Sequence, residues 1–143
     1  MKATKIDKIQ EEYRLLFEEL EDDFDRYDYL LALSGKMPFM GEEEKTDQLL
    51  FKGCQAHIWL KISLENGRLR MNADSDVILV RGMLAILQQM VDGREPKEIM
   101  ESRLDLFDLP VFEGIIPVAR QAGMALLVQE IRRQASRVEE NGE

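Results

Sequence analysis

Residues 58–73 read IWLKISLENGRLRMNA, and every second residue of the two runs in this stretch is apolar. Such alternation is typical of β-strands that bury one face and expose the other. Asn66 and Gly67 separate the two runs, and an Asn-Gly pair in this setting is the strongest short signal for a β-hairpin. Residues 49–52, LLFK, form a third strand candidate upstream. The stretch therefore predicts a small three-stranded antiparallel sheet.

Helical periodicity flanks the predicted sheet on both sides. Apolar residues from Ile6 to Phe24 recur every three or four positions, which is the spacing of an amphipathic helix. After the sheet, Asp74 or Ser75 can cap a helix that is apolar on more than one face and should be the most buried. The expected helices cover residues 5–24, 25–34, 76–91, 96–103 and 119–137.

The remaining segments have the composition of loops. Residues 36–47 contain proline, glycine and three successive glutamates and are expected to form a loop. Residues 104–117 contain two prolines and are expected to be irregular or to form one helical turn. The polar tail of residues 138–143 is expected to fray. We interpret residues 1–143 as a single α+β domain, in which helices from both ends of the chain pack on the three-stranded antiparallel sheet.

The composition excludes several classes of site. One cysteine cannot form an intramolecular disulfide, a CxxC redox pair or a cluster of thiolate ligands, and with a single histidine no metal site is expected. Asp and Glu number 28 against 19 Lys and Arg, a formal net charge of −9, which argues against nucleic acid as a partner. Protein or small-molecule partners are therefore the better expectation.

The sequence also gives an expectation for the compartment. The N-terminal residues carry charges throughout and lack the apolar core of roughly 7–15 residues that a secretory signal needs. No stretch holds the run of about 18 apolar residues that a membrane span requires, so no membrane association is expected. We expect a cytoplasmic protein, in a reducing compartment where a lone thiol stays free.

The candidate functional residues lie in residues 52–59, KGCQAHIW, which hold the only cysteine, histidine and tryptophan of the chain. Cys54 follows Gly53, which allows the backbone angles of a tight turn, so the thiol is expected at the tip of a connection between two strands. An inert, buried cysteine is the plain alternative. Lys52 or His57 could favour the thiolate, although His57 could equally be a surface residue at the start of a strand.

At these residues the sequence resembles the SufE family of sulfur-acceptor proteins. Residues 53–59, GCQAHIW, are similar to the family's Gly-Cys-Gln-Ser-x-Val-Trp, with Ala56 in the place of Ser. Residues 74–82, DSDVILVRG, resemble its Asp-Ser-Asp-Ala-x-Ile-Val-Lys/Arg-Gly, and residues 119–124, ARQAGM, resemble its Ser-Arg-x-x-Gly-Leu. The resemblance extends over residues 27–137 and implies a fold of the SufE/NifU type.

The resemblance implies a sulfur carrier. Cys54 would take persulfide sulfur from a SufS-type cysteine desulfurase, stimulate that enzyme and pass the sulfur to a SufBCD-type scaffold that assembles Fe–S clusters. The chain would need no cofactor, since pyridoxal phosphate belongs to the desulfurase, and Cys54 should be partly buried when the protein is unbound. Residues that the resemblance places around the cysteine loop are Gly53, Gln55, His57, Asp74, Asp76 and Arg120.

Other interpretations stay open at this point. Asp74 or Asp76 could cap the buried helix, and Arg120 could pair with a carboxylate. The chain could be a stand-alone thiol enzyme with a Cys–His pair, or an activator that binds the desulfurase without covalent chemistry. A scaffold of the related IscU type is disfavoured, because one cysteine cannot supply its usual ligands. We expect a monomer or a weak homodimer.

Overall fold

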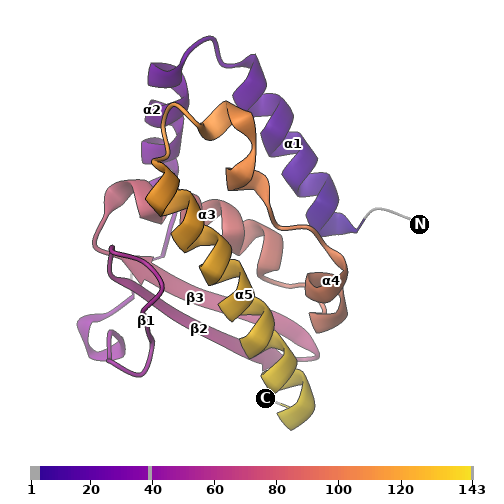
Figure 1. Ribbon diagram of the computed structural model, residues 1–143. Helices are drawn as coiled ribbons and strands as arrows, with labels where there is room; N and C mark the ends of the chain where they lie inside the picture. The colour runs from indigo at the N-terminus through magenta and orange to yellow at the C-terminus, as the bar shows by residue number, and fades with distance from the viewer. Residues whose placement is uncertain (1–3, 39, 143) are drawn as a thin grey trace.

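The structure, a computed structural model, describes residues 4–38 and 40–142. Two helices precede the sheet, β1 and the β2–β3 hairpin follow in chain order, and the remaining helices complete the chain (Figure 1). The predicted α+β class with a three-stranded antiparallel sheet is confirmed. The elements are α1 (Lys5–Glu19), α2 (Asp23–Ser34), β1 (Leu50–Phe51), β2 (Ile58–Glu65), β3 (Arg68–Ser75), α3 (Ile78–Val91), α4 (Pro96–Glu101) and α5 (Val118–Asn141), with short 3-10 turns at Glu42–Glu44, Leu106–Asp108 and Pro110–Phe112.

The sheet has the order β1-β2-β3, and both pairings are antiparallel. Asn66 and Gly67 have φ values of 53° and 77°, and a two-residue hairpin turn with positive φ at both positions matches the twist of the strands. Across the hairpin Leu60 lies opposite Ala73, and burial alternates along most of β2 and β3, so one face of the hairpin is buried. The hairpin signal in the sequence is therefore confirmed.

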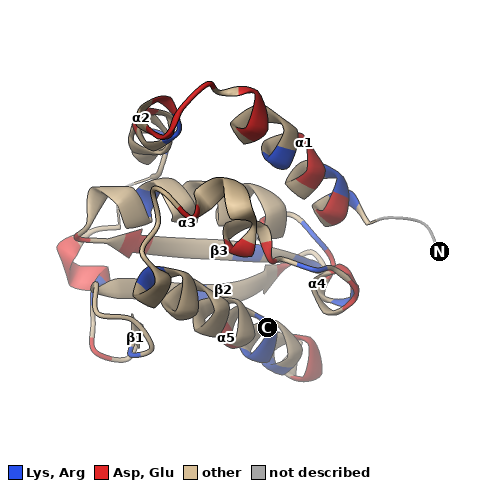
Figure 2. Cartoon of the chain, turned by 45° about the horizontal axis from the view of Figure 1, so that its top comes forward, with Lys and Arg blue, Asp and Glu red and all other residues tan. Residues whose placement is uncertain are grey.

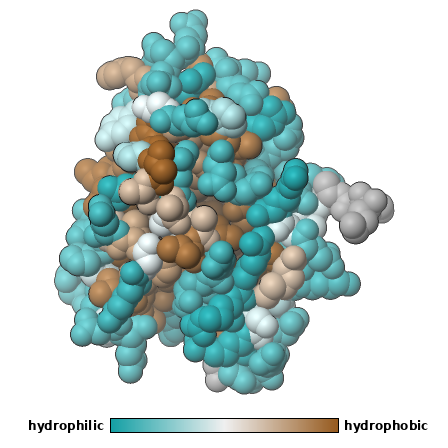
Figure 3. Space-filling model, in the orientation of Figure 1, coloured by the Kyte–Doolittle hydropathy of each residue, from teal (hydrophilic) through white to brown (hydrophobic). Residues whose placement is uncertain are grey.

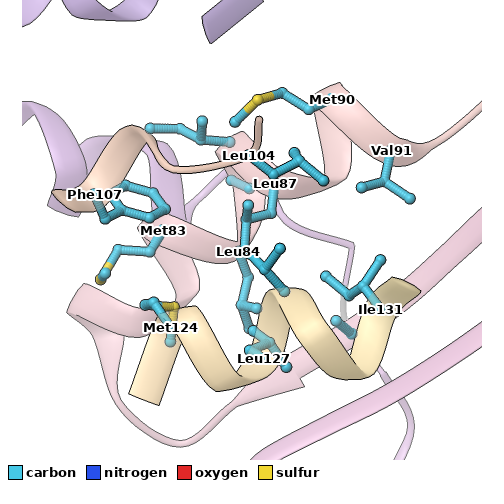
Figure 4. Close-up of a cluster of buried hydrophobic side chains, with 14 of the residues drawn as sticks. Met83, Leu84, Leu87, Met90, Val91, Leu104, Phe107, Met124, Leu127 and Ile131 are labelled. Atoms are coloured by element: carbon cyan, nitrogen blue, oxygen red, sulfur yellow. The ribbon is translucent and has the colours of Figure 1, made fainter. Parts of the chain in front are cut away.

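The buried face of the sheet lies under α3 and α5. α3 packs on β3 and α5 on β2, while α1 and α2 pack against α3 (Figure 1). In the core, Met83 and Leu84 of α3 lie beside Met124 and Leu127 of α5 (Figure 4). A Cβ on Gly82 would collide with the carbonyl of Leu30, so glycine allows α2 and α3 to approach closely. Because α3 lies between the sheet and the other helices, it is apolar on more than one face.

The largest differences from the expected helix boundaries are at the end of α1 and the end of α5. α1 ends at Glu19, and not at residue 24, because the Asp22 side chain accepts a hydrogen bond from the N–H of Asp25 and so begins a new helix. Phe24 consequently belongs to α2, where 77% of its surface is exposed.

At the other end, α5 continues through most of the tail that was expected to fray. It ends where Gly142 adopts the left-handed conformation of a helix cap, and Val138 is buried on its inner face. Residue 143 lies outside the described residues. Within the described part of the chain, no helix has the length and hydropathy needed to cross a bilayer.

Candidate functional site

Cys54 lies in the connection between β1 and β2, as its position between two strand candidates predicts. Gly53, immediately before it, is needed for a reason other than a special backbone angle, since its φ is not positive. A Cβ at this position would collide with the ring of Phe51. Glycine therefore lets the Phe51 ring lie against the backbone of the cysteine loop.

The Cys54 side chain is half-buried and leans against the first turns of α5. A Cβ built on Gly123 of α5 would lie 3.0 Å from the Cys54 sulfur. The thiol therefore occupies the space that the side chain of any residue other than glycine would need at position 123. Cys54 also lines a small pocket of about 140 Å³ together with Gln55, Pro117, Ala119 and Arg120. The loop and the start of α5, far apart in the sequence, thus build one site.

Arg120, which lines this pocket, has a hydrogen-bond donor without a partner in the described part of the chain. Its Nη1 atom is buried and has no hydrogen-bond partner within residues 4–38 and 40–142. Among these residues Arg120 forms no ion pair with a carboxylate, so the structure gives no support to the interpretation of Arg120 as a partner of a carboxylate. Because buried donors in proteins are nearly always satisfied, the unpartnered N–H of a residue that lines the thiol pocket makes Arg120 a candidate to bind a ligand or reaction partner.

His57 faces Asp76 and is not among the residues that line the thiol pocket. Its Nδ1 atom lies 2.8 Å from an Asp76 carboxylate oxygen, and its backbone N–H donates to the other oxygen at 3.2 Å. Both side chains are at least half exposed. Lys52 is exposed and does not line the pocket either. The structure therefore places Asp76 and His57 together at the end of the cysteine loop, where the pair joins that loop to the start of α3.

Asp74 is buried and lies apart from the thiol pocket. Burial alone would raise the pKa of its carboxyl group, but N–H groups of Ser75 and Met40, with Arg81 and Lys45, hold this pKa below its ordinary value. Arg81 contacts one carboxylate oxygen, and Lys45 lies 3.5 Å from the other. Through its contacts with Met40 and Lys45, Asp74 therefore holds the segment around residues 40–45 against the end of β3.

The start of α3 corrects the capping interpretation. Its N-cap is Val77, and neither Asp74 nor Asp76 makes a side-chain capping bond. Instead, the hydroxyl of Ser75 accepts a hydrogen bond from the N–H of Val77 at 3.2 Å and donates to the carbonyl of His57 at 2.6 Å. Ser75 thus holds the beginning of α3 against the end of the cysteine loop.

Sequence reasoning gave no role in the site to Gly123 or Pro117, and it considered Ser75 only as a possible helix cap. Gly123 lies inside residues 119–124, and the family resemblance of that stretch is its only signal in the sequence. Gln55, in contrast, lines the pocket as expected for a residue of the cysteine loop. Within the described residues, no three His, Cys, Asp or Glu side chains gather as metal ligands would.

Comparison with known proteins gives the family. The SufE family, described as an Fe-S metabolism associated domain, matches residues 11–135. This chain belongs to the SufE family. The match includes the cysteine loop, the start of α3 and most of α5, so all of the elements that build the thiol pocket belong to the family domain.

Relatives of this SufE-family protein have varied lengths. Over 109 residues, 75% of the chain, it is 31% identical to the sulfur acceptor protein CsdE of Escherichia coli and covers 74% of that protein. It is also 31% identical over 123 residues to an uncharacterized SufE-like protein of Rhizobium etli, with 81% of the chain and 82% of the relative covered. A chloroplastic quinolinate synthase of Arabidopsis thaliana is 36% identical over 97 residues, which are 66% of the chain but only 14% of that protein.

Among solved structures, the fold matches that of a hypothetical protein from Thermus thermophilus, determined in solution. The TM-score is 0.75 with 17% sequence identity, and the match covers 92% of this chain and 96% of the other. The arrangement of helices on a three-stranded sheet is therefore shared at low identity, while the likeness carries no information on activity.

Proposed function

We propose that this SufE-family protein is a sulfur acceptor, which takes sulfur from a cysteine desulfurase onto Cys54 and passes it to an assembly scaffold for Fe–S clusters. The observation that carries the proposal is the Cys54 pocket, which is lined by the chain's single thiol and by Arg120, a residue with an unpartnered buried N–H. The sulfur acceptor CsdE of E. coli, similar over most of the chain, supports the same assignment.

The proposed transfer is an exchange between a thiol and a persulfide. The Cys54 thiolate attacks the terminal sulfur of a persulfide on the desulfurase cysteine, and an S–S bond forms on Cys54 while the S–S bond on the desulfurase breaks. The desulfurase cysteine leaves as a thiolate, and Cys54 carries the terminal sulfur as a persulfide. The exchange needs no oxidant, and the pyridoxal phosphate that first removes sulfur from free cysteine resides on the desulfurase.

The pocket has properties that suit this carrier. The Cys54 sulfur is held against Gly123 and is only partly open to solvent, which limits access of cellular reductants to a persulfide. The unpartnered Nη1–H of Arg120 offers a hydrogen bond to the terminal sulfur, which is anionic once deprotonated. With a volume of about 140 Å³, the pocket has room for one added sulfur atom but not for a large substrate.

The surface beside the pocket suits a protein partner. Val118, between the pocket residues Pro117 and Ala119, is 81% exposed, and Figure 3 shows apolar surface over this end of α5. Large apolar side chains on a monomer's surface, when they lie next to a reactive group, are typical of interaction sites. We infer that a SufS-type desulfurase docks here and inserts its own cysteine next to Cys54, and that a SufBCD-type complex receives the sulfur.

The test is intact mass spectrometry after incubation with a pyridoxal-phosphate desulfurase and L-cysteine. Wild-type protein should gain the mass of one sulfur atom, lose it on treatment with a reductant, and stimulate sulfide release by the desulfurase. Cys54→Ser should gain no mass and should not stimulate. Samples without L-cysteine control for adventitious sulfur, and transfer of radiolabelled sulfur to a SufBCD-type scaffold tests the second half of the proposal.

Two results would contradict the proposal in different ways. If Cys54→Ser stimulated the desulfurase as well as the wild type, the protein would be an activator that binds without covalent transfer. If wild-type protein turned over small thiol or peroxide substrates without the desulfurase, it would be a stand-alone thiol enzyme.

A further inference from the structure

The outer edge of β2 is only partly covered by β1. β1 pairs with the first two residues of β2, which continues to Glu65. Farther along, the N–H of Leu60 donates to the carbonyl of Leu49, and the N–H of Ile62 donates to the side-chain oxygen of Gln134 on α5 at 3.1 Å. A side-chain amide thus takes the place that the carbonyl of a neighbouring strand would occupy in a sheet.

A groove of about 400 Å³ lies between this edge and the C-terminal half of α5. Its charged lining residues are Lys61, Arg133 and Arg137 against the single carboxylate of Glu130, three positive groups minus one negative group, or a local charge of +2. The whole chain has a net charge of −9. Figure 2 shows acidic residues along the turn from α1 to α2, and basic together with acidic residues on α5.

The spacing of the two arginines fits an extended chain. Arg133 and Arg137 are exposed and one helical turn apart, which is about 6 Å along the axis of α5. Alternate residues of a β-strand lie about 6.7 Å apart and point to the same side. Two acidic side chains at positions i and i+2 of a strand added to β2 can therefore reach the two arginines together.

We propose that this groove, defined by the edge of β2 at residues 60–64 and by Arg133 and Arg137, binds an extended acidic segment of a partner protein. The segment adds a strand to β2 in line with β1, and its carbonyl replaces Gln134 on the N–H of Ile62. Its carboxylates pair with Arg137 and, in place of Glu130, with Arg133, which is paired with Glu130 at 2.6 Å in the structure. The inference does not depend on the chemistry of Cys54, since the groove and the thiol pocket have no lining residue in common.

The test uses the full chain and a labelled peptide, acetyl-Thr-Val-Glu-Val-Glu-Val-Thr-amide, in a fluorescence anisotropy titration. We expect saturable binding below roughly 1 mM, about tenfold weaker binding of a peptide with Gln in place of both Glu residues, and no binding of a peptide with Pro in place of the central Val. Raising the salt from about 0.1 M to about 1 M should weaken the wild-type complex, because the Debye length falls from about 10 Å to about 3 Å.

Variants locate the binding on the protein. Arg133→Glu combined with Arg137→Glu should abolish binding, whereas Lys8→Glu combined with Lys97→Glu makes the same change of charge on exposed residues outside the groove and should weaken binding only slightly. In NMR spectra of the wild type, the amide signals of Ile62 and Leu64 should shift most on addition of the peptide. Far-UV circular dichroism verifies that all variants are folded.

Three results would overturn the inference. One is failure of the peptide to bind at roughly 1 mM. Another is binding that the arginine double variant leaves unchanged, or NMR shifts confined to residues outside the groove. The third is a concentration-dependent dimer, detected by analytical ultracentrifugation and lost in the arginine double variant, because a second copy of this chain would then occupy the groove.

Discussion

Arg81 and Arg120 occupy equivalent positions, each in the first turn of a helix that packs on the sheet, yet their guanidinium groups have opposite surroundings. Arg81 contacts the buried carboxylate of Asp74 and donates to the carbonyls of Ser34 and Met37 at 3.3 and 3.2 Å. Arg120 has a buried nitrogen without a partner within the described residues. Arg81 therefore stabilises the fold, whereas Arg120 has a donor that is available to a ligand or a partner protein.

The different surroundings of Arg81 and Arg120 indicate a structural role for the first and a functional role for the second. A buried polar group that finds all its partners holds segments together, whereas a buried donor left unpaired costs about 1–3 kcal/mol. A protein retains such a cost where a ligand or a reaction intermediate completes the hydrogen bond. We therefore expect substitutions around Arg81 to act on stability and those around Arg120 to act on sulfur transfer.

The largest effect is expected for Asp74→Ala, which should lower the free energy of unfolding by about 3 kcal/mol or more, because Arg81 is left as a buried charge without its partner. Urea unfolding followed by the fluorescence of Trp59, the only tryptophan, measures the loss. Glu101→Ala, which removes an exposed ion pair with Lys97, is the matched control and should cost less than about 1 kcal/mol. Equal effects of the two substitutions would show that Asp74 does not have the structural role described here.

The next effect is expected for Arg120→Ala, which should slow persulfide formation on Cys54 about tenfold or more, since a hydrogen bond to a charged group contributes about 1.5–3 kcal/mol. The unfolding free energy should stay the same or rise, because an unsatisfied buried donor is removed. Rapid quenching with an alkylating reagent and mass spectrometry gives the rate. Arg120→Lys should recover part of it.

Arg68→Ala serves as the control for the loss of an arginine, since Arg68 is exposed and, among the described residues, its side chain bonds only the carbonyl of Gly93. Its rate should match that of the wild type. If Arg120→Ala instead lowered stability and left the rate intact, the two arginines would have the same structural role and the comparison would fail.

The sequence predicted the sheet, the order of the helices and the place of Cys54 in a connection, because periodicity and turn chemistry act between near neighbours in the chain. It did not reveal the contact of Gly123 with the Cys54 sulfur or the orphan N–H of Arg120. Both depend on how the start of α5 lies against a loop far upstream, and no local pattern encodes such a contact. The family resemblance placed Arg120 near the loop, and the structure added its unsatisfied donor.

The pH dependence of stability tests the Asp74 side of the comparison. The folded-state pKa of Asp74 lies below its ordinary value of 3.8, so the ionised carboxylate stabilises the fold at neutral pH. That contribution should be lost as the pH falls below 3.8 through the folded-state pKa. The difference in unfolding free energy between wild type and Asp74→Asn should therefore shrink over this range, in urea titrations at a series of pH values. A difference that stayed constant until acid unfolding would contradict this assignment.

The smallest effect is expected for His57→Ala, which tests whether the thiol depends on a general base. His57 is bonded to Asp76, most of its side chain is exposed, and it does not line the thiol pocket. Its removal should cost less than about 1 kcal/mol of stability, as for other exposed pairs. The rate of Cys54 alkylation and the rate of persulfide formation should both stay within about twofold of the wild type, far less than the change in Arg120→Ala. A loss of about tenfold would instead assign proton transfer to His57 and support a Cys–His enzyme. Together, Arg120→Ala and His57→Ala decide whether the anionic sulfur of Cys54 is stabilised by Arg120 of α5 or by His57 of the cysteine loop.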